Sequence, residues 1–295
     1  MSHDSAALAR SITWNSSKQT YYTARLLVDK DRVDDFCRAY AYFRWIDDVI
    51  DKTVANNEER ISFIRHQRDL IDCFYGIGIK SDLTAQEQML ADIISHDKKP
   101  NGRLQSFIRN MFAIIEFDAY RKERRQAITL KELKWYTGCL GKSVTDGLQY
   151  FIGNGCSYPE TDDQYQAAIA AHITHLLRDT VQDNAEGFIN IPSEYLKEHY
   201  ISPDDLTNPV FSAWVRKRVE EARQYFCQGK DYLDRLDVLR CKIAGYWYCA
   251  RFESILDTIE SDDYILRASY KKPTGFAWLK MAWLAARVSL EHISR

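Results

Sequence analysis

Apolar residues recur every three to four positions along most of this chain, the spacing that places them on one face of an α-helix. Seven long segments carry the pattern, namely residues 30–75, 104–125, 130–152, 164–183, 205–236, 238–260 and 276–292. The sequence has neither runs of short alternating strands nor the strand–helix alternation typical of a parallel sheet. No linker or internal repeat divides it, so we expect residues 1–295 to form a single all-α domain.

Proline and glycine mark the expected connections between these helices. All six prolines lie after residue 99, in polar or glycine-containing stretches. The expected loops are residues 76–82, 97–103, 153–163, 184–193, 201–208 and 269–275. The helix expected over 164–183 is rich in small residues, which fits either close helix packing or the lining of a central cavity.

Composition narrows the class of protein. A net charge of −2 gives no electrostatic reason to expect nucleic-acid binding. No stretch reaches the roughly 18 to 20 apolar residues that cross a bilayer, and the N-terminus has no apolar run of the signal-peptide type. The seven cysteines are scattered and lack metal-ligand spacing. We therefore expect a cytoplasmic protein with reduced thiols.

Two pairs of aspartates are the main chemical signal. Asp47 and Asp51 form the first pair, Asp179 and Asp183 the second, and each pair has an arginine close before it. Four-residue spacing puts both carboxylates of a pair on one helical face. Facing each other across an apolar bundle, four carboxylates would repel unless cations lay between them. Mg²⁺, which prefers oxygen ligands and shares its coordination shell with phosphate oxygens, fits this pattern.

Spacing alone is weak support, because carboxylates at this separation also make ordinary salt bridges. Asp31 and Asp35 are four residues apart in a stretch that reads as a solvated helix start. The motif pairs differ because each follows a segment of buried character, where an uncompensated carboxylate is costly. Salt bridging explains an isolated pair, whereas two such pairs together favour cation and diphosphate binding.

Five segments in order along the chain carry a resemblance to the squalene and phytoene synthase family. Residues 40–51 (YAYFRWIDDVID) resemble its first aspartate-rich motif. Residues 176–183 (LLRDTVQD), followed by 187–192 (GFINIP), resemble the second motif and its trailing segment. Residues 17–22 are similar to the N-terminal diphosphate flap, 136–148 to the Tyr- and Gly-containing helix, and 251–257 to the late helix.

The resemblance implies an all-α, isoprenoid-synthase-type helical bundle with a central cavity, Mg²⁺ as cofactor and an allylic prenyl diphosphate as substrate. It implies metal ligation by Asp47, Asp51, Asp179, Asp183 and His175. It implies diphosphate binding by Lys18, Arg44 and Arg178, since a guanidinium donates bidentate hydrogen bonds to such oxygens. Tyr40 and Tyr136 would lie near the cavity, where a phenol orients the leaving group or a ring face stabilises a carbocation.

Two histidines depart from the family pattern. His172 and His175 stand where the family usually has Gln and Asn, seven and four residues before Asp179. His175 takes the place of a metal-binding Asn, although imidazole is a softer ligand than Mg²⁺ prefers. Both histidines are catalytic candidates, with His175 as a base or diphosphate donor near neutral pH. The alternative is a histidine held in a structural hydrogen bond between helices.

Three functions follow from the resemblance. The first is a prenyltransferase that ionises allylic prenyl diphosphates and joins two of them head to head, giving a squalene- or phytoene-like product. The second keeps the ionisation but transfers the prenyl group to another acceptor, such as an aromatic ring. The third is a non-catalytic relative that acts as a scaffold. The retention of all four aspartates argues against this third function.

The C-terminal segment, residues 271–284, is basic at its start and then aromatic. It either closes the bundle or makes a peripheral contact with a membrane surface.

Overall fold

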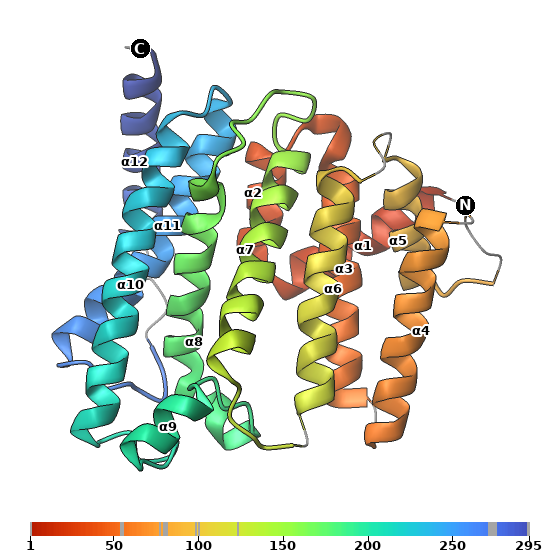
Figure 1. The fold of residues 1–295 in the computed structure, drawn as a ribbon. Helices are drawn as coiled ribbons and strands as arrows, with labels where there is room; N and C mark the ends of the chain where they lie inside the picture. Colours follow the sequence, from red (N-terminus) through yellow and green to blue (C-terminus); the bar gives the residue numbers. More distant parts are fainter. Residues whose placement is uncertain are drawn as a thin grey trace. The chain divides into compact units, whose positions relative to one another are not determined.

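The structure is a computed structural model that describes the chain apart from residues 1, 54–55, 77, 79–81, 98, 100, 123, 271–275 and 294–295. Every regular element in the described residues is a helix, as the apolar spacing predicted (Figure 1). The α-helices are α1 (Ser2–Ser16), α2 (Lys18–Leu27), α3 (Val33–Asp48), α4 (Asn57–Gly76), α5 (Ala85–Ser95), α6 (Arg103–Arg121), α7 (Leu130–Phe151), α8 (Gln166–Glu186), α9 (Ser193–His199), α10 (Pro209–Asp234), α11 (Leu239–Ser261) and α12 (Phe276–Ile293). The shorter elements are η1 (Lys30–Arg32), η2 (Val49–Thr53), which is π-helical, and η3 (Asp162–Tyr165).

The chain forms two compact units. Unit 1 comprises residues Met1–Tyr120 and Asp146–Cys156, and unit 2 comprises Arg121–Thr145 and Ser157–Arg295. Helix α7 therefore gives its last turns to unit 1 and its earlier turns to unit 2. Each unit has its own buried core, and the interpretation of residues 1–295 as one domain stays a prediction.

Helix α3 is central to unit 1, where it packs against α1, α2 and α5. Its apolar face buries Tyr42 and Ile46 completely. Phe43 meets Phe107 of α6 edge to face with ring centroids 5.5 Å apart, and Phe107 meets Phe151 of α7 at 6.1 Å. Because aromatic burial contributes strongly to packing, these contacts fix the last turns of α3, which carry the first aspartate pair.

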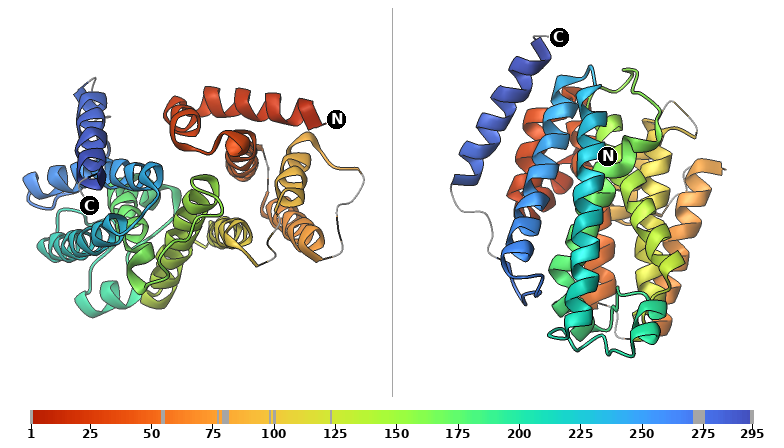
Figure 2. Two further views of the ribbon diagram at one scale, coloured as in Figure 1. Left: turned by 90° about the horizontal axis from the view of Figure 1, so that it is seen from above. Right: turned by 60° about the vertical axis from the view of Figure 1, so that its left-hand side comes forward.

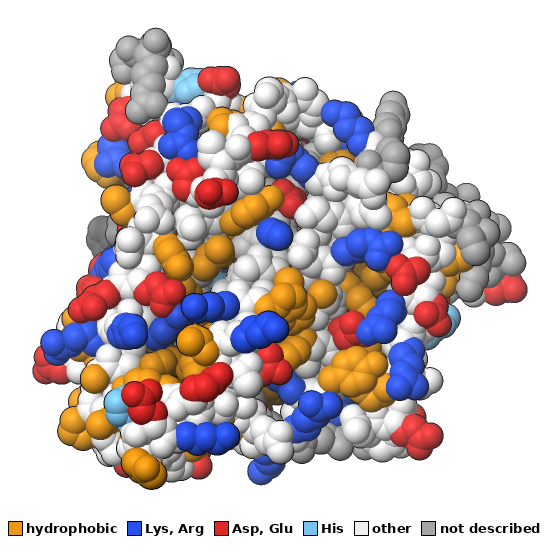
Figure 3. Space-filling view, viewed as in Figure 1, with side chains coloured by type: hydrophobic (Ala, Val, Ile, Leu, Met, Phe, Trp, Pro, Cys, Tyr) orange, Lys and Arg blue, Asp and Glu red, His pale blue; other side chains and the backbone are white. Residues whose placement is uncertain are grey.

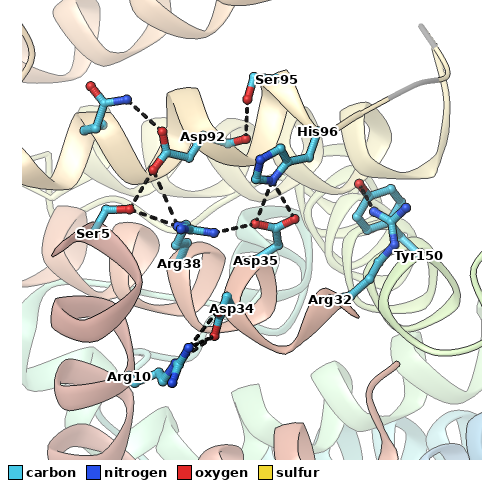
Figure 4. Close-up of polar contacts among 11 residues, drawn as sticks. Ser5, Arg10, Arg32, Asp34, Asp35, Arg38, Asp92, Ser95, His96 and Tyr150 are labelled. Carbon is cyan, nitrogen blue, oxygen red and sulfur yellow. Dashed lines mark hydrogen bonds and ion pairs between the residues drawn. The ribbon is translucent and has the colours of Figure 1, made fainter. Parts of the chain in front are cut away.

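A buried polar network also holds α3 in place (Figure 4). Arg38 donates to Asp35 at 2.8 Å and to the hydroxyl of Ser5 in α1 at 3.0 Å. Ser5 donates in turn to Asp92 of α5 at 2.6 Å, and His96 Nδ1 lies 3.0 Å from the second oxygen of Asp35. A buried charge is tolerated only with such partners, so these residues tie α1, α3 and α5 together.

Helix α8 is central to unit 2, where it lies beside α10 and α11 (Figure 1 and Figure 2). Its small residues are buried, and Ala170 and Ala171 have no exposed surface. Glycines on two neighbouring helices face it: a Cβ added at Gly229 of α10 would lie 2.4 Å from the backbone nitrogen of Ala167, and one at Gly141 of α7 would lie 2.5 Å from Ile169. The small residues of this helix therefore serve close packing.

We expect Gly229→Ala to lower the free energy of unfolding by about 1–3 kcal/mol, because the new methyl group meets backbone that cannot move aside. Gly138→Ala in α7 is the matched control, since a Cβ there has nothing within 4 Å and alanine favours a helix over glycine. Urea denaturation followed by circular dichroism measures both variants. Equal stability of the two would contradict the close approach of α8 and α10.

The apolar pattern missed some helices and joined others. Helices α1, α2, α5 and α9 lie outside the seven predicted segments. Helix α5 has a clear local signal, because Thr84 and Glu87 form a capping box at its N-terminus. The helix predicted over 30–75 is interrupted after α3, and α4 begins afresh where Asn56 accepts a hydrogen bond from the backbone of Glu59 at 2.9 Å.

Charges of both signs are mixed on the face shown in Figure 3, where blue, red and orange side chains alternate. No single-sign patch dominates that face. Recognition of an anion on this face therefore has to come from individually placed side chains.

Candidate active site

The first aspartate pair stands where α3 changes into the π-helical turn η2. Asp47 is in the last turn of α3 and Asp51 is in η2, and both side chains are exposed. Single π-helical turns are rare and often occur at functional sites. Desolvation by the surrounding protein and repulsion by Asp51 raise the pKa of Asp47 to about 7, in spite of Arg44. The Asp47 side chain is nevertheless exposed, so its carboxylate remains accessible from solvent although many protein atoms surround it.

Arg44 is paired with Asp48 rather than with the motif aspartates. Its guanidinium donates two hydrogen bonds to that carboxylate, at 3.1 and 2.8 Å, on a half-exposed helix surface. Tyr40 lies one turn earlier, and its phenol hydrogen-bonds Ser17, the residue that caps α2. Burial is the main reason why the pKa of Tyr40 is raised. Lys18 follows Ser17, and its ammonium lies 5.3 Å from the centre of the Trp14 ring.

Unit 1 also adds an acid that sequence reasoning missed. Asp118 of α6 contributes to the raised pKa of Asp47, so its charge lies near the first motif. Asp118 is 67 residues after Asp51 and 71 after Asp47, and the residues around it form no motif that would indicate a site. Only the packing of α6 in unit 1 brings it there.

The second motif lies along α8. Arg178 donates two hydrogen bonds to the adjacent Asp179, each at 2.6 Å, and His175 Nε2 lies 2.8 Å from the same carboxylate. Burial alone would raise the pKa of Asp179, but the hydrogen bonds from Arg178 and His175 outweigh it and hold the pKa well below its usual range. Asp179 is therefore an anion at neutral pH, and a cation would compete with two present partners for it.

Asp183 follows one turn later and has a different partner. Asn190, in the segment after α8, donates to its Oδ2 at 2.9 Å, and Asn190 is itself 4% exposed. The carbonyl oxygen of Asn190 accepts from Arg121, the last residue of α6, at 2.8 Å. Neither Arg121 nor Asn190 was predicted as a site residue, although Asn190 lies in the segment that resembles the family.

The imidazole ring of His172 is buried in unit 2. Both ring nitrogens lack a partner among the described residues, and only 4% of the residue is exposed. Its ring lies 5.0 Å from that of Tyr136 and 6.1 Å from that of His175. Burial first, and then the neighbouring charges, keep its pKa well below the usual range, so the imidazole is neutral. The structural hydrogen bond considered above for His172 is therefore missing from the described part of the chain.

The donor set fits a hard divalent cation. Carboxylate oxygens are the ligands that Mg²⁺ prefers, and desolvation followed by repulsion from Asp51 raises the pKa of Asp47. Among the described residues, no three His, Cys, Asp or Glu side chains form a group that could hold a metal ion. His175 contacts Asp179, so its assignment as a ligand stays a prediction.

The candidate residues fall into two sets. Lys18, Tyr40, Arg44, Asp47 and Asp51 belong to unit 1, and Tyr136, His172, His175, Arg178, Asp179 and Asp183 belong to unit 2. Within unit 1, Tyr40, Arg44 and Asp47 lie along one helix, and within unit 2 His172, His175 and Asp179 share a face of α8. The meeting of the two sets around shared cations stays a prediction.

These helices and motifs define a member of a known enzyme family. A model of the squalene/phytoene synthase family matches residues 15–276, a span that includes both aspartate pairs. The chain belongs to this family.

Individual relatives agree with the assignment. The 15-cis-phytoene synthase of Synechocystis sp. is 26% identical over 302 residues, which cover 95% of this chain and 85% of the relative. The chloroplastic phytoene synthase 2 of Solanum lycopersicum is 25% identical over 289 residues, covering 92% and 87%. Among solved structures, squalene synthase HpnC from Alicyclobacillus acidocaldarius has a TM-score of 0.70 at 16% identity, covering 90% of this chain and 96% of that one. A dehydrosqualene synthase has a TM-score of 0.71 at 16% identity, covering 99% and 98%.

The family match confirms the resemblance that the motifs indicated, and it agrees with the predicted prenyltransferase class. The structural similarity confirms the predicted all-α, isoprenoid-synthase-type fold.

Proposed function

We propose that this chain is a Mg²⁺-dependent prenyltransferase that ionises allylic prenyl diphosphates and joins two of them head to head. The product would be a squalene- or phytoene-like hydrocarbon. The observation that carries the proposal is the family match over residues 15–276, within which all four motif aspartates are retained.

Two groups of side chains would contribute to breaking the C–O bond, one by holding cations and one by binding the diphosphate. Asp47, Asp51, Asp179 and Asp183 would hold the cations, and His175 would add a ligand beside Asp179. Mg²⁺, when bound, supplies positive charge that stabilises the departing diphosphate. Lys18, Arg44 and Arg178 would bind the remaining oxygens. For Arg178 this means exchanging the neighbouring carboxylate for substrate, which its bidentate geometry suits.

The allylic cation left by ionisation needs a dry and electron-rich surrounding. Tyr136 and Tyr40 offer ring faces that stabilise a cation. Tyr136 is buried, and burial raises the pKa of Tyr40, so the Tyr40 phenol stays neutral at physiological pH. A neutral imidazole at His172 adds no competing positive charge.

Incubation with Mg²⁺ and allylic prenyl diphosphates of several chain lengths tests the proposal. We expect diphosphate release and a hydrocarbon of twice the donor length, identified by mass spectrometry with and without NADPH. Absence of release with every donor would contradict the proposal and favour the scaffold alternative.

One observation favours a second candidate, transfer to an acceptor that is not a prenyl diphosphate. The two ring nitrogens of His172 have no partner among the described residues, and a buried unsatisfied polar group costs about 1–3 kcal/mol. An acceptor with a hydroxyl group would satisfy that imidazole, whereas a hydrocarbon chain would not. Diphosphate release that needs an added phenolic acceptor would support this candidate over head-to-head condensation.

We also propose peripheral contact with a membrane surface through α12. This helix buries Leu284 and Val288 and packs against α11, while Trp283 and Leu290 on its other side are 63% and 69% exposed. The basic residues at 271–275 lie outside the described residues. No described helix has the length and apolarity of a membrane span. Co-sedimentation with phospholipid vesicles measures the contact.

A further inference from the structure

The turn after α8 brings Asn190 back to the second motif. Gly187 ends the helix with φ +93°, a left-handed conformation that glycine adopts without strain. The backbone nitrogen of Phe188 donates to the carbonyl of Asp183 at 2.7 Å. A Cβ at Gly187 would lie 2.8 Å from the Cγ of Arg125, so the turn is also packed tightly. The chain therefore reverses within a few residues and sets the Asn190 amide against Asp183.

The segment that carries Asn190 is fastened on both sides. Ile128 donates its backbone N–H to the carbonyl of Ile189 at 3.2 Å, and Ser193 donates to the carbonyl of Ile128 at 2.7 Å. These two bonds flank Asn190, so its backbone has little freedom to move away from Asp183. The amide is thus a fixed donor and not a surface side chain that happens to lie nearby.

Arg121 fixes the other end of the amide. It is 8% exposed and donates to Asn190 Oδ1 at 2.8 Å. Its guanidinium carbon lies 5.4 Å from the ring centre of Tyr136 and 5.2 Å from that of Phe188. The side-chain oxygen of Asn190 accepts from the Arg121 guanidinium, so the side-chain NH₂ group must point at Asp183. The opposite orientation of the amide would lose both hydrogen bonds.

We propose that Arg121 and Asn190 form a positioning pair for Asp183. The pair holds the Asp183 carboxylate in one orientation through a partly buried Arg–Asn–Asp chain of hydrogen bonds, and it thereby raises the affinity of the second motif for its cation. This inference rests on the proposed function, because it takes Asp183 as a cation ligand. Both residues would act through Asp183, as positioning residues.

The amide of Asn190 links the two charged groups, because its oxygen accepts from Arg121 and its nitrogen donates to Asp183. Arg121 thereby orients the donor that contacts the Asp183 carboxylate. Groups that orient metal ligands from outside typically change metal affinity or activity by about 10- to 100-fold when they are removed.

Asn190→Leu tests the pair, because leucine has a similar size and cannot donate to Asp183. We expect the variant to bind Mn²⁺, in the presence of inorganic diphosphate, about tenfold more weakly than the wild type, as followed by electron paramagnetic resonance. In the activity assay, the Mg²⁺ concentration for half-maximal rate should rise by a similar factor while the rate at saturating Mg²⁺ recovers. A purely structural role would instead lower the thermal midpoint without moving the Mn²⁺ affinity.

Asn184→Leu is the structural control in the same turn, since the Asn184 side chain donates to the carbonyl of Pro203 at 2.7 Å and not to a motif residue. We expect it to lose stability and to keep wild-type Mn²⁺ affinity. Arg121→Met should weaken Mn²⁺ binding in the same direction as Asn190→Leu, and Arg121→Lys, which keeps the charge, should restore part of it. If Arg121→Met does not fold, Arg121→Lys alone tests the role of Arg121. We then expect this variant to bind Mn²⁺ more weakly than the wild type and more tightly than Asn190→Leu.

Wild-type Mn²⁺ affinity in Asn190→Leu would overturn the proposal, and wild-type affinity in both Arg121 variants would overturn the part played by Arg121. These outcomes are separate from those of the proposed function. A wild-type protein that releases no diphosphate from any prenyl donor, while Asn190→Leu still weakens Mn²⁺ binding, would leave the positioning pair standing and refute the reaction.

Discussion

Asp179→Asn is expected to lower the rate of diphosphate release by on the order of 10³-fold, the size of effect seen when one preorganised electrostatic contact to a reacting group is removed. Asparagine keeps the shape of the side chain but removes the negative charge that a cation needs. Asp47→Asn should have a similar effect, because its carboxylate belongs to the first pair. Single-turnover assays of diphosphate release with saturating donor and Mg²⁺ measure the loss.

Asp31→Asn is the matched control for both variants. Asp31 and Asp35 have the same four-residue spacing, yet Asp31 is an exposed residue of η1 outside the two motifs. We expect this variant to release diphosphate at the wild-type rate, and all three proteins to keep the wild-type circular dichroism spectrum. Wild-type turnover in either motif variant would refute the metal assignment.

The second large effect is expected for stability. Arg38→Met should lower the free energy of unfolding by about 3–5 kcal/mol, the usual cost of removing one partner of a buried ion pair. Arg38 is 5% exposed and lies between Asp35 and Asp92, so its loss leaves two carboxylates without their cation in the core of unit 1. Urea denaturation followed by circular dichroism measures the change.

Arg10→Met is the control for Arg38→Met. Arg10 pairs with Asp34 at 2.7 Å, also between α1 and α3 (Figure 4), but the two side chains are 52% and 38% exposed. A pair that water reaches contributes little, so we expect a loss of less than about 1 kcal/mol. Equal losses in the two variants would show that burial of the Arg38 network does not matter.

Much of the helical fold was predictable because helix periodicity is a local property. The pattern over 130–152 corresponds to α7 within one residue at its end, and the pattern over 238–260 corresponds to α11 within one residue. It failed at α5, where the capping box was the better signal. It also failed between α3 and α4, where apolar residues continue into a π-helical turn and, among the described residues, the Asn56 cap marks the start of α4.

The candidate site was predictable in part for the same reason. His175, Asp179 and Asp183 recur every four residues, so any helix over 166–186 places them along one side. What the spacing did not reveal is the partner of each side chain. Arg178 folds back on its neighbour, whereas Asp183 is held by Asn190.

The sequence by itself determined the helical class, the family, and the placement of Asp179 and Asp183 along one side of α8, because these depend on short-range spacing and on motifs that can be read directly. Tertiary structure alone decided which polar groups are buried and what satisfies them. Arg121 and Asn190 are 69 residues apart and meet only because unit 2 folds. His172 is 4% exposed, and its two ring nitrogens have no partner among the described residues; such burial depends on every chain segment that packs around the side chain. A local sequence pattern therefore does not reveal how strongly a side chain is desolvated in the folded protein.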